Sequence, residues 1–308
     1  MTTRILNRIL NLGSINIDYV YAVPHFVQAG ETLSSTGRRI FPGGKGLNQS
    51  IALARAGGDV THAGMVGSEG AYLLDILRDA GVDAGLVSTG TGPSGHTVIQ
   101  VNPQGENCIL LFPGANTEID GAFVDRALNG FGEGDILVLQ NEVSCAAYAM
   151  NAAKARGMKI AFNPSPFGPE IAGYPLGLVD WLLLNEVEAS ALTNLADNKS
   201  PDDMLNAMGD MYPGAVIVLT LGKDGVICRA DGKTYRHGIY PVKAVDTTAA
   251  GDTFTGYFIS SVAAGKSIAE ALEIASMASA ISVSKPGAAE SIPDISDINI
   301  SFMRKIFV

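Results

Sequence analysis

The stretch DILVLQNEVSCAAYAMNAAKARGMKIAF, residues 135–162, decides the fold class. Its hydrophobic pattern predicts a strand over Asp135–Leu139, a helix over Cys145–Arg156 and a second strand over Lys159–Phe162. The strands are continuous apolar runs instead of alternating ones, which is typical of a parallel sheet with helices on both faces. The centre of the chain is therefore predicted to be α/β.

The same rhythm of strands and helices continues on both sides of this stretch. Short apolar runs alternate with segments whose apolar residues recur at helical spacing. This alternation predicts a three-layer α/β/α sandwich with a mostly parallel central sheet. The further predicted strands are 9–15, 180–184 and 215–219, and the further predicted helices are 46–56, 71–80, 186–192, 250–264 and 268–283.

Two segments, 17–40 and 94–112, interrupt this rhythm. They are rich in β-branched and turn-forming residues. Within the second, Thr97–Val101 and Asn107–Phe112 predict two strands joined by a turn at NPQGE, residues 102–106. We expect both segments to form a small antiparallel β element, the lid, which projects from the core. Residues 1–308 are then one domain with the lid inserted in it.

The composition narrows the class of protein. Of the 308 residues, 47 % are hydrophobic and 17 % are charged, so the chain is too apolar to be disordered. The net charge of −10 argues against a nucleic-acid partner, because that affinity rests on cations that meet phosphates. No apolar run approaches the ~18–20 residues of a membrane span, and the first residues lack the apolar core of a signal peptide. We expect no nucleic-acid partner, no membrane and a cytoplasmic location.

Several common fingerprints of cofactor and catalytic sites are missing. The three cysteines and four histidines are scattered without metal-ligand spacing. The sequence has no G-x-x-x-x-G-K-[ST] phosphate loop, no G-x-G-x-x-G after the first strand and no G-x-S-x-G elbow. These absences weaken the interpretation of the chain as a P-loop protein, a dehydrogenase or a hydrolase.

The segment FPGGKGLN, residues 41–48, is the first that could carry chemistry. Its glycines lie just before a predicted helix, where a ligand can approach the backbone and the unpaired N–H groups of the helix start. Lys45 and Asn48 add side chains that can bind hydroxyl groups. A Gly-Gly pair alone also fits an ordinary strand-to-helix turn, but the pattern GGKG-x-N is more specific.

The segment VDTTAAGDTF, residues 245–254, is the most informative one. The small residues 249–251 leave room for an anion at the start of the next helix. A carboxylate such as Asp252 in the first turn should repel this anion. Its presence there is explained if Asp252 takes the proton from a hydroxyl group that attacks the anion. The alternative is that Asp252 only caps the helix, and the residues alone favour neither interpretation.

Polar residues follow the ends of five predicted strands. Ligands of open α/β sheets bind outside the carboxyl ends of the strands. One such cluster would usually be a solvated loop, but five together favour a shared site. The clusters are NLGSINID (11–18), QNE (140–142), NPSP (163–166), NEVE (185–188) and TLGKDG (220–225).

These segments together resemble the ribokinase-like sugar kinases of the phosphofructokinase-B type. Residues 43–48 are similar to the N-terminal Gly-Gly signature of that family, and residues 245–254 are similar to its C-terminal signature. The resemblance extends from Asn11 to about Pro293, which is nearly the whole chain. Further matching motifs, in order, are GSINID (13–18), GET (30–32), NPSP (163–166), NEVEA (185–189) and TLGKDG (220–225).

The resemblance implies an activity. Family members transfer the γ-phosphoryl group of ATP to a primary hydroxyl of a sugar and need Mg²⁺, and the ribokinase branch is activated by K⁺. The implied reaction is the conversion of D-ribose to ribose 5-phosphate, with a deoxyribose kinase or another ribokinase-like sugar kinase as the alternative within the class. From other classes we keep a non-catalytic sugar-binding regulator and a nucleotide-binding oxidoreductase. The resemblance also implies a homodimer through the lid.

The resemblance further implies roles for individual residues. Those implied for catalysis are the base Asp252 and an anion hole at Ala249, Ala250 and Gly251. Those implied for the sugar are Asn16, Asp18, Gly44, Lys45, Asn48 and Glu142. Those implied for ATP and its Mg²⁺ are Asn185, Glu188, Thr220, Gly222 and Gly225. Those implied for a K⁺ loop are Asp246, Thr248, Ser282, Lys285, Gly287 and Ser291.

Overall fold

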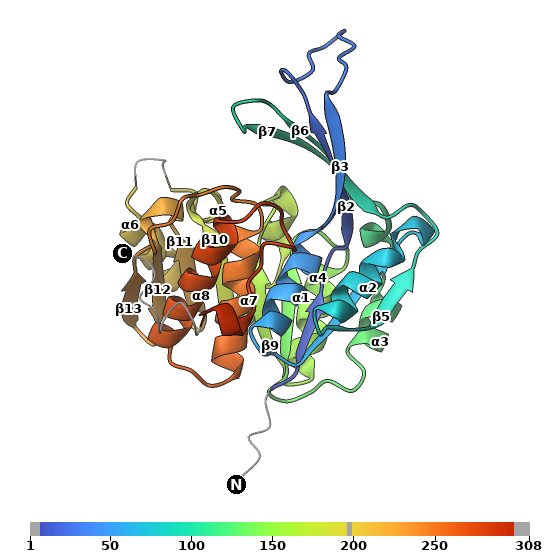
Figure 1. Cartoon of the computed structure of the whole chain (residues 1–308). Helices are drawn as coiled ribbons and strands as arrows, with labels where there is room; N and C mark the ends of the chain where they lie inside the picture. Colours follow the sequence, from blue (N-terminus) through green and yellow to red (C-terminus); the bar gives the residue numbers. More distant parts are fainter. Residues whose placement is uncertain (1–6, 196–198, 299–308) are drawn as a thin grey trace.

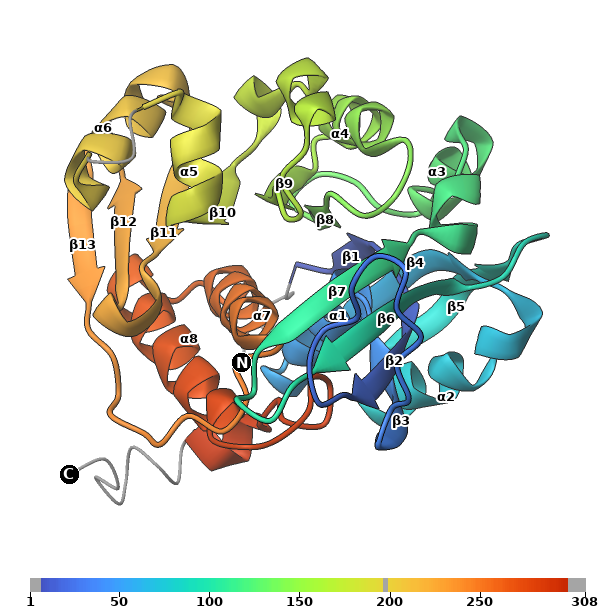
Figure 2. The same ribbon diagram turned by 90° about the horizontal axis from the view of Figure 1, so that it is seen from above.

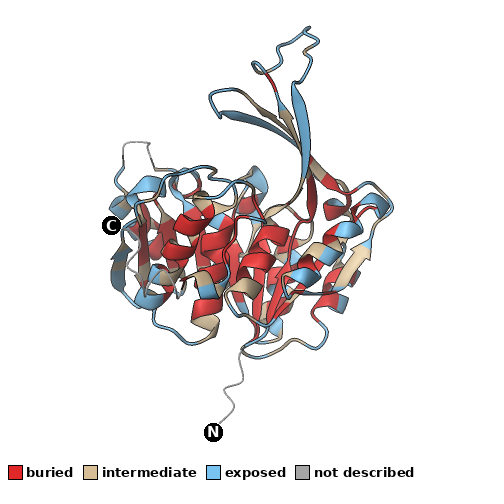
Figure 3. Ribbon diagram, viewed as in Figure 1, coloured by how far each residue is buried: buried red, intermediate tan, exposed pale blue. Residues whose placement is uncertain are grey.

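The computed structural model describes residues 7–195 and 199–298. A large sheet lies between two groups of helices and forms a layered body, and a smaller sheet projects from this body (Figures 1 and 2). Figure 3 shows that the buried residues concentrate in the body, whereas much of the projecting sheet is exposed. The body therefore contains the hydrophobic core.

The central sheet has nine strands. It is parallel from β5 to β11, and β12 and β13 are antiparallel at one edge. Strands β1 and β8 near its middle are buried along their whole length, because helices cover both faces of the sheet. In spatial order the strands are β13 (Lys233–His237), β12 (Val226–Ala230), β11 (Val216–Thr220), β10 (Trp181–Asn185), β9 (Lys159–Asn163), β8 (Ile136–Gln140), β1 (Ile9–Leu12), β4 (Val60–Val66) and β5 (Asp83–Thr89).

One group of helices lies on each face of the central sheet (Figure 2), and the buried hydrophobic residues form two cores. The core that includes Tyr257 and Phe258 lies with α1, α2, α7 and α8, and the core that includes Phe162 lies with α3 to α6. No helix within 7–195 and 199–298 combines the length and the hydrophobicity that a membrane span needs. The helices are α1 (Lys45–Arg55), α2 (Tyr72–Asp79), α3 (Gly121–Ala127), α4 (Ala146–Ala155), α5 (Glu186–Thr193), α6 (Pro201–Met211), α7 (Ala250–Ala263) and α8 (Ile268–Val283), with short 3₁₀ turns at 68–70, 114–118, 169–173, 176–178 and 222–224.

The smaller sheet is the lid. Its strand order is β3-β2-β6-β7, and β6 and β7 form the predicted hairpin. The expectation of a purely antiparallel lid is wrong in one respect, since β2 and β6 run parallel. The reason is that the long connection through the body brings the chain back to the lid in the same direction. The strands are β2 (Asn16–Ala22), β3 (Gly37–Gly43), β6 (Gly95–Val101) and β7 (Asn107–Phe112).

The predicted fold class is confirmed: the strand, helix and strand of residues 135–162 are β8, α4 and β9. The predicted first strand, 9–15, is shorter and ends at Leu12, because the chain turns there toward the lid. The patterns missed α3, α6, β4, β5, β12 and β13. These elements are short or carry polar residues, such as the KTYRH of β13.

Candidate functional site

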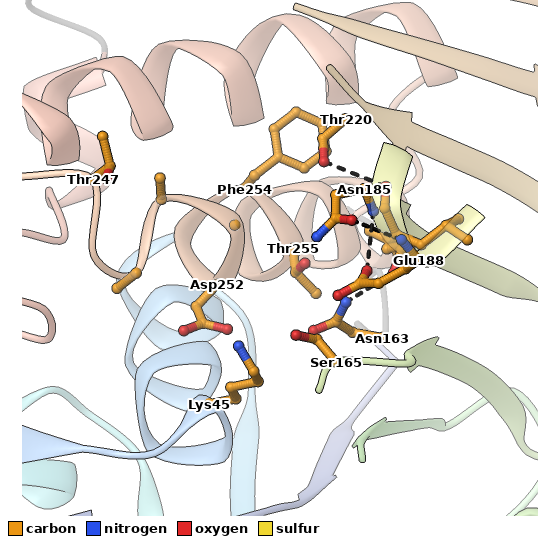
Figure 4. Close-up of a pocket in the computed structure, with 15 residues that line it drawn as sticks. Lys45, Asn163, Ser165, Asn185, Glu188, Thr220, Thr247, Asp252, Phe254 and Thr255 are labelled. Atoms are coloured by element: carbon orange, nitrogen blue, oxygen red, sulfur yellow. Dashed lines mark hydrogen bonds between the residues drawn. The ribbon is translucent and has the colours of Figure 1, made fainter. Parts of the chain in front are cut away.

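A cavity lies at the carboxyl ends of the parallel strands (Figure 4). Strand β1 lies between β4 and β8, so the chain first builds one half of the sheet and then the other. Such a reversal of strand order is the place where open α/β sheets bind ligands. Residues of α1, of β9 to β11, of α5 and of the start of α7 line the cavity, including Lys45, Asn163, Glu188, Thr220 and Asp252.

Helix α7 begins beside this cavity without a capping side chain. Ala249 at the N-cap has a left-handed backbone, with φ of 59°. Among residues 7–195 and 199–298, no group accepts a hydrogen bond from the backbone N–H of Gly251 or of Asp252. These two N–H groups are available to an anion in the cavity. The alternative that Asp252 only caps its helix is therefore wrong.

The carboxylate of Asp252 is held by two amides of α1. Asn48 Nδ2 donates to Oδ2 at 3.1 Å, and Gln49 Nε2 donates to Oδ1 at 2.9 Å. The side chain is buried, with 7 % of the residue exposed. Because both oxygens are held, the carboxylate has one defined place at the edge of the cavity.

Lys45 and Glu142 add charges near Asp252. The ammonium of Lys45 lies toward Asp252 in the cavity (Figure 4). Burial opposes the charge on Lys45, but attraction to Asp252 and Glu142 outweighs it and raises the pKa of the ammonium. Burial raises the pKa of Glu142 against the attraction of Lys45, whose main-chain N–H donates to Glu142 Oε2 at 3.0 Å. The Ser14 hydroxyl donates to the same carboxylate oxygen.

Gly44 allows α1 to begin against the end of β1. Its φ is 92°, in the left-handed region, and a Cβ there would lie 2.9 Å from the carbonyl oxygen of Ser14. That carbonyl accepts the N–H of Leu47 at 2.9 Å. This close approach brings two residues of α1 into place, Lys45 at the cavity and Asn48 against Asp252.

The expected sugar-binding residues of β2 lie where the lid joins the body. The hydroxyl of Thr97 donates to Asp18 Oδ1 at 2.5 Å, and burial raises the pKa of Asp18 despite this bond. Asn116 Nδ2 donates to Asn16 Oδ1 at 2.7 Å, so the NH₂ group of Asn16 remains for another acceptor. Asp18 and Asn16 thus offer an acceptor and a donor for hydroxyl groups.

The expected nucleotide-binding residues follow β10 and β11. Asn185 and Glu188 form a capping box at the start of α5. The N–H of Glu188 donates to Asn185 Oδ1 at 2.9 Å, and the N–H of Asn185 donates to Glu188 Oε2 at 3.0 Å. Both residues line the cavity together with Thr220. Gly222 and Gly225 have positive φ and form the turn after β11, outside the lining of the cavity.

The two segments expected to hold K⁺ lie against each other beside the start of α7. Asp246 accepts the N–H of Gly287 at 3.0 Å and the hydroxyl of Thr248 at 2.6 Å. The hydroxyls of Ser282 and Ser291 are buried and lie 2.7 Å apart. Across residues 7–195 and 199–298, no cluster of three or more His, Cys, Asp or Glu side chains could hold a metal ion. The six expected residues, Asp246, Thr248, Ser282, Lys285, Gly287 and Ser291, all belong to these two segments.

A comparison with models of protein families identifies the family. The model described as pfkB family carbohydrate kinase matches residues 6–295. The chain belongs to the pfkB family of carbohydrate kinases. This membership leaves the oxidoreductase alternative without support.

The relatives of this pfkB chain include proteins named ribokinase. The ribokinase of Haemophilus influenzae is 37 % identical over 289 residues, which cover 92 % of this chain and 94 % of that one. The structure of Arabidopsis thaliana ribokinase complexed with ribose and ATP has a TM-score of 0.84 and 28 % identity, and covers 96 % of this chain and 98 % of its own. The ribokinase of Cryptococcus neoformans in complex with ADP has a TM-score of 0.82 and 32 % identity, and covers 96 % of this chain and 99 % of its own.

Three residues that hold the predicted site residues were not themselves predicted, although Ser14 lies in the polar cluster 11–18. Gln49 holds Asp252, and Ser14 binds Glu142. Thr97 in turn holds Asp18. For Gln49 a signal existed, because it follows Lys45 by four residues and lies on the same side of the helix. Ser14 and Thr97 could not be found this way, since their partners are distant in the chain.

His62 of β4 makes the stability of this pfkB protein depend on pH. It is fully buried with its Nδ1 2.7 Å from the Ser50 hydroxyl, and burial lowers its pKa from 6.5 to about 4. Between these values the unfolded chain binds a proton that the folded chain does not. Stability therefore falls as the pH falls through this range, and we expect a loss of about 2 kcal/mol between pH ~7 and pH ~5.

Urea denaturation of the wild type and of His62→Asn at these pH values measures this contribution. The asparagine can keep a bond to Ser50 but cannot take up a proton. We expect the variant to lose about 2 kcal/mol less stability than the wild type over the same interval. Equal losses in the two proteins would show that another group carries the pH dependence.

Proposed function

We propose that the chain is an ATP-dependent sugar kinase that converts D-ribose to ribose 5-phosphate. Asp252 carries the proposal, since it is a buried carboxylate held by two amides beside the free N–H groups at the start of α7. Transfer of a phosphoryl group to a hydroxyl requires such a base next to an anion site. The ribokinases that match nearly the whole chain, one of them complexed with ribose and ATP, support ribose as the acceptor.

In this function Asp252 acts on the primary hydroxyl of the sugar. It takes the hydroxyl proton while the hydroxyl oxygen bonds to the γ-phosphorus of ATP. The bond from that phosphorus to the bridging oxygen breaks, and ADP leaves. Asp18 accepts bonds from sugar hydroxyls and Asn16 donates one, so that the primary hydroxyl is held toward Asp252.

Local donors neutralise the charge on the transferred group. The N–H groups of Gly251 and Asp252 and the dipole of α7 meet the phosphoryl oxygens, and Lys45 adds a positive charge from the other side. Asn185 and Glu188 bind the Mg²⁺ of the MgATP substrate on the side of β10. The turn of Gly222 and Gly225 contacts the nucleotide.

A phosphorylation assay with ATP and a panel of sugars tests this function. The panel includes D-ribose, 2-deoxy-D-ribose, D-fructose and D-glucose, and the readouts are ADP release and the NMR spectrum of the product. We expect the highest kcat/KM for D-ribose and a product phosphorylated at O5. A higher value for another sugar would replace ribose as the substrate, and no turnover with any sugar would favour the sugar-binding regulator.

We also propose that K⁺ binds between the two segments beside α7. The carboxylate, hydroxyl and main-chain carbonyl oxygens there fit this ion, because K⁺ binds oxygen ligands. Asp246, Ser282 and Ser291 would hold it together with main-chain oxygens. When bound, K⁺ supplies a positive charge that ties the segment before Ala249 to the C-terminal segment.

The K⁺ proposal predicts faster turnover in K⁺ than in Na⁺ or choline at equal ionic strength. Ordering of the segment before Ala249 also orders the N–H groups at the start of α7, so kcat should rise with K⁺ concentration and saturate. Asp246→Ala should lose this response, so that its turnover is the same in K⁺ as in choline. Equal rates of the wild type in all three salts would contradict the site.

We propose in addition that two copies of the chain associate through their lids. Strand β7 is an edge of the lid sheet, and its apolar side chains are exposed, with Leu110 at 70 % and Ile109 at 55 %. Ile40 of β3, at the other edge, is 51 % exposed. An apolar edge strand of this kind is normally covered by a partner.

The absence of a nucleic-acid partner and the cytoplasmic location stay predictions.

Light scattering during gel filtration tests the association. We expect the wild type to elute with twice the mass of one chain, and Leu110→Glu to elute with the mass of one chain, because a charge cannot be buried in an apolar interface. Met211→Glu makes the same change at an exposed methionine of α6, outside the lid, and should leave the dimer intact. A monomeric wild type, or a dimeric Leu110→Glu, would contradict association through β7.

A further inference from the structure

A continuous chain of buried amides leads from Asp252 into the body. Gln49 Nε2 donates to Asp252 Oδ1 at 2.9 Å, and Gln140 Nε2 donates to Gln49 Oε1 at 2.7 Å. Gln49 and Gln140 are completely buried. Gln140 Nε2 also donates to Asn11 Oδ1 at 2.9 Å, so the chain continues to β1. Four elements, α7, α1, β8 and β1, are thereby joined by one chain of hydrogen bonds that ends at the carboxylate.

The direction of every bond in this chain follows from its two ends. Asn11 Nδ2 lies 2.8 Å from the carbonyl oxygen of Gly46, which can only accept, so the NH₂ group of Asn11 must face it. The oxygen of Asn11 then faces Gln140, which must donate, and the oxygen of Gln49 must accept. The NH₂ group of Gln49 then donates to Asp252, whose ionised carboxylate can only accept, and, more weakly, to Asn163 Oδ1 at 3.3 Å. No amide in the chain can be turned round without placing two like groups together.

We propose that Gln49, oriented by Gln140, is a positioning residue for Asp252 in phosphoryl transfer. This inference rests on the proposed function. The bond from Gln49 holds the carboxylate toward the cavity and away from the N–H groups of its own helix. Without it Asn48 alone holds the carboxylate, and Asp252 can turn toward the start of α7. A carboxylate on those N–H groups would occupy the place of the transferred phosphoryl.

Other charged groups also act on Asp252. Lys45 of α1 attracts it, and Glu142 after β8 and Asp18 of β2 repel it. All three remain in a variant of Gln49. A difference between that variant and the wild type in the acid limb of the pH–rate profile therefore reports the lost amide.

The test is the steady-state kinetics of the full chain with MgATP and its best sugar, measured across pH for the wild type and for Gln49→Met. Methionine matches the volume of glutamine but has no N–H donor. We expect kcat to fall about tenfold or more, which corresponds to the loss of a hydrogen bond to a charged group. The KM values for sugar and ATP should stay within about twofold, because Gln49 acts on the base rather than on either substrate. The acid limb should move to higher pH, since the ionised carboxylate loses a donor.

Ser50→Ala is the matched control. Ser50 is buried on the same helix and belongs to the same network at its far end, where it bonds to Asn11 and His62. Asn11 keeps its bond to the Gly46 carbonyl in this variant, so the direction of the amide chain is preserved. We expect Ser50→Ala to lose stability but to keep the kcat and the acid limb of the wild type. If Gln49→Met and Ser50→Ala change kcat and the pH profile alike, Gln49 has only a structural role and the inference is overturned.

Gln49→Glu covers the case in which Gln49→Met does not fold. It keeps the shape of the side chain and places a carboxylate against Asp252, so the pair retains a proton to higher pH and the acid limb moves further. An acid limb at the wild-type position in Gln49→Glu overturns the inference. A wild type that phosphorylates no sugar refutes the proposed function and this inference with it, whereas an active wild type with unchanged Gln49 variants refutes the inference alone.

Discussion

Asp252→Asn is expected to lower kcat by about 10²- to 10⁴-fold while the dissociation constants for sugar and ATP change little. The amide has nearly the shape of the carboxylate but cannot take the proton of the acceptor hydroxyl. Its NH₂ group would also meet one of the two donors, Asn48 or Gln49, so one of these bonds is lost. Coupled ADP-release kinetics give kcat, and titration calorimetry gives the dissociation constants.

The same chemical change at Asp231 is the control for this variant. Asp231 lies exposed in the turn between β12 and β13 with φ of 49°, a conformation that asparagine also tolerates. Asp231→Asn should therefore keep the kcat and the stability of the wild type. A kcat of Asp252→Asn close to that of the wild type would show that another group takes the proton.

Gly251→Ala is expected to lower kcat/KM by about 10²-fold or more without loss of stability. A Cβ at this position meets no atom within 4 Å, and Gly251 has no positive φ, so the folded chain accommodates the methyl group. In the proposed complex, however, the methyl group lies where the phosphoryl oxygens approach the N–H groups of Gly251 and Asp252. Measurement of kcat/KM for ATP reports the loss of activity, and the midpoint of urea denaturation reports whether the variant keeps the stability of the wild type.

Gly214→Ala provides the matched control for the anion site. A Cβ at Gly214, before β11 and outside the cavity, likewise meets nothing within 4 Å. This variant should change neither kcat/KM nor the midpoint. If Gly251→Ala keeps the kcat/KM of the wild type, the start of α7 does not bind the transferred phosphoryl group.

The central part of the fold could be predicted because its signals are local. A run such as ILVL in β8 must be buried on both sides, and the apolar spacing of Ile268–Val283 predicts the bounds of α8 to the residue. The edge strand β13, KTYRH, has no such signal, because an exposed edge does not demand apolar residues. The parallel pairing of β2 with β6 could not be predicted either, since it depends on where the chain returns after building half of the body.

The site divides in the same way. Residues 41–48 and 245–254 place their candidates next to predicted helix starts, so the sequence indicated Lys45, Asn48 and the segment 249–252. The residues next to Asp252 in the chain did not decide whether it caps its helix or faces the cavity. The packing of α1 against α7 decided it, because this packing presents Asn48 and Gln49 to the carboxylate.

The sequence by itself thus determined the layered α/β fold, the family resemblance and the segments that carry the candidate site, since each depends on residues close together in the chain. Only the tertiary structure decided which polar atoms meet. The order Asn11, Gln140, Gln49 and Asp252 joins side chains from four separate elements. The direction of the hydrogen bonds between these side chains is set by the two ends of the chain of amides. Each end is a group that can only accept, the main-chain carbonyl of Gly46 at one end and the Asp252 carboxylate at the other. No local pattern encodes such an order, because hydrogen bonds between distant side chains exist only after the helices and strands have packed.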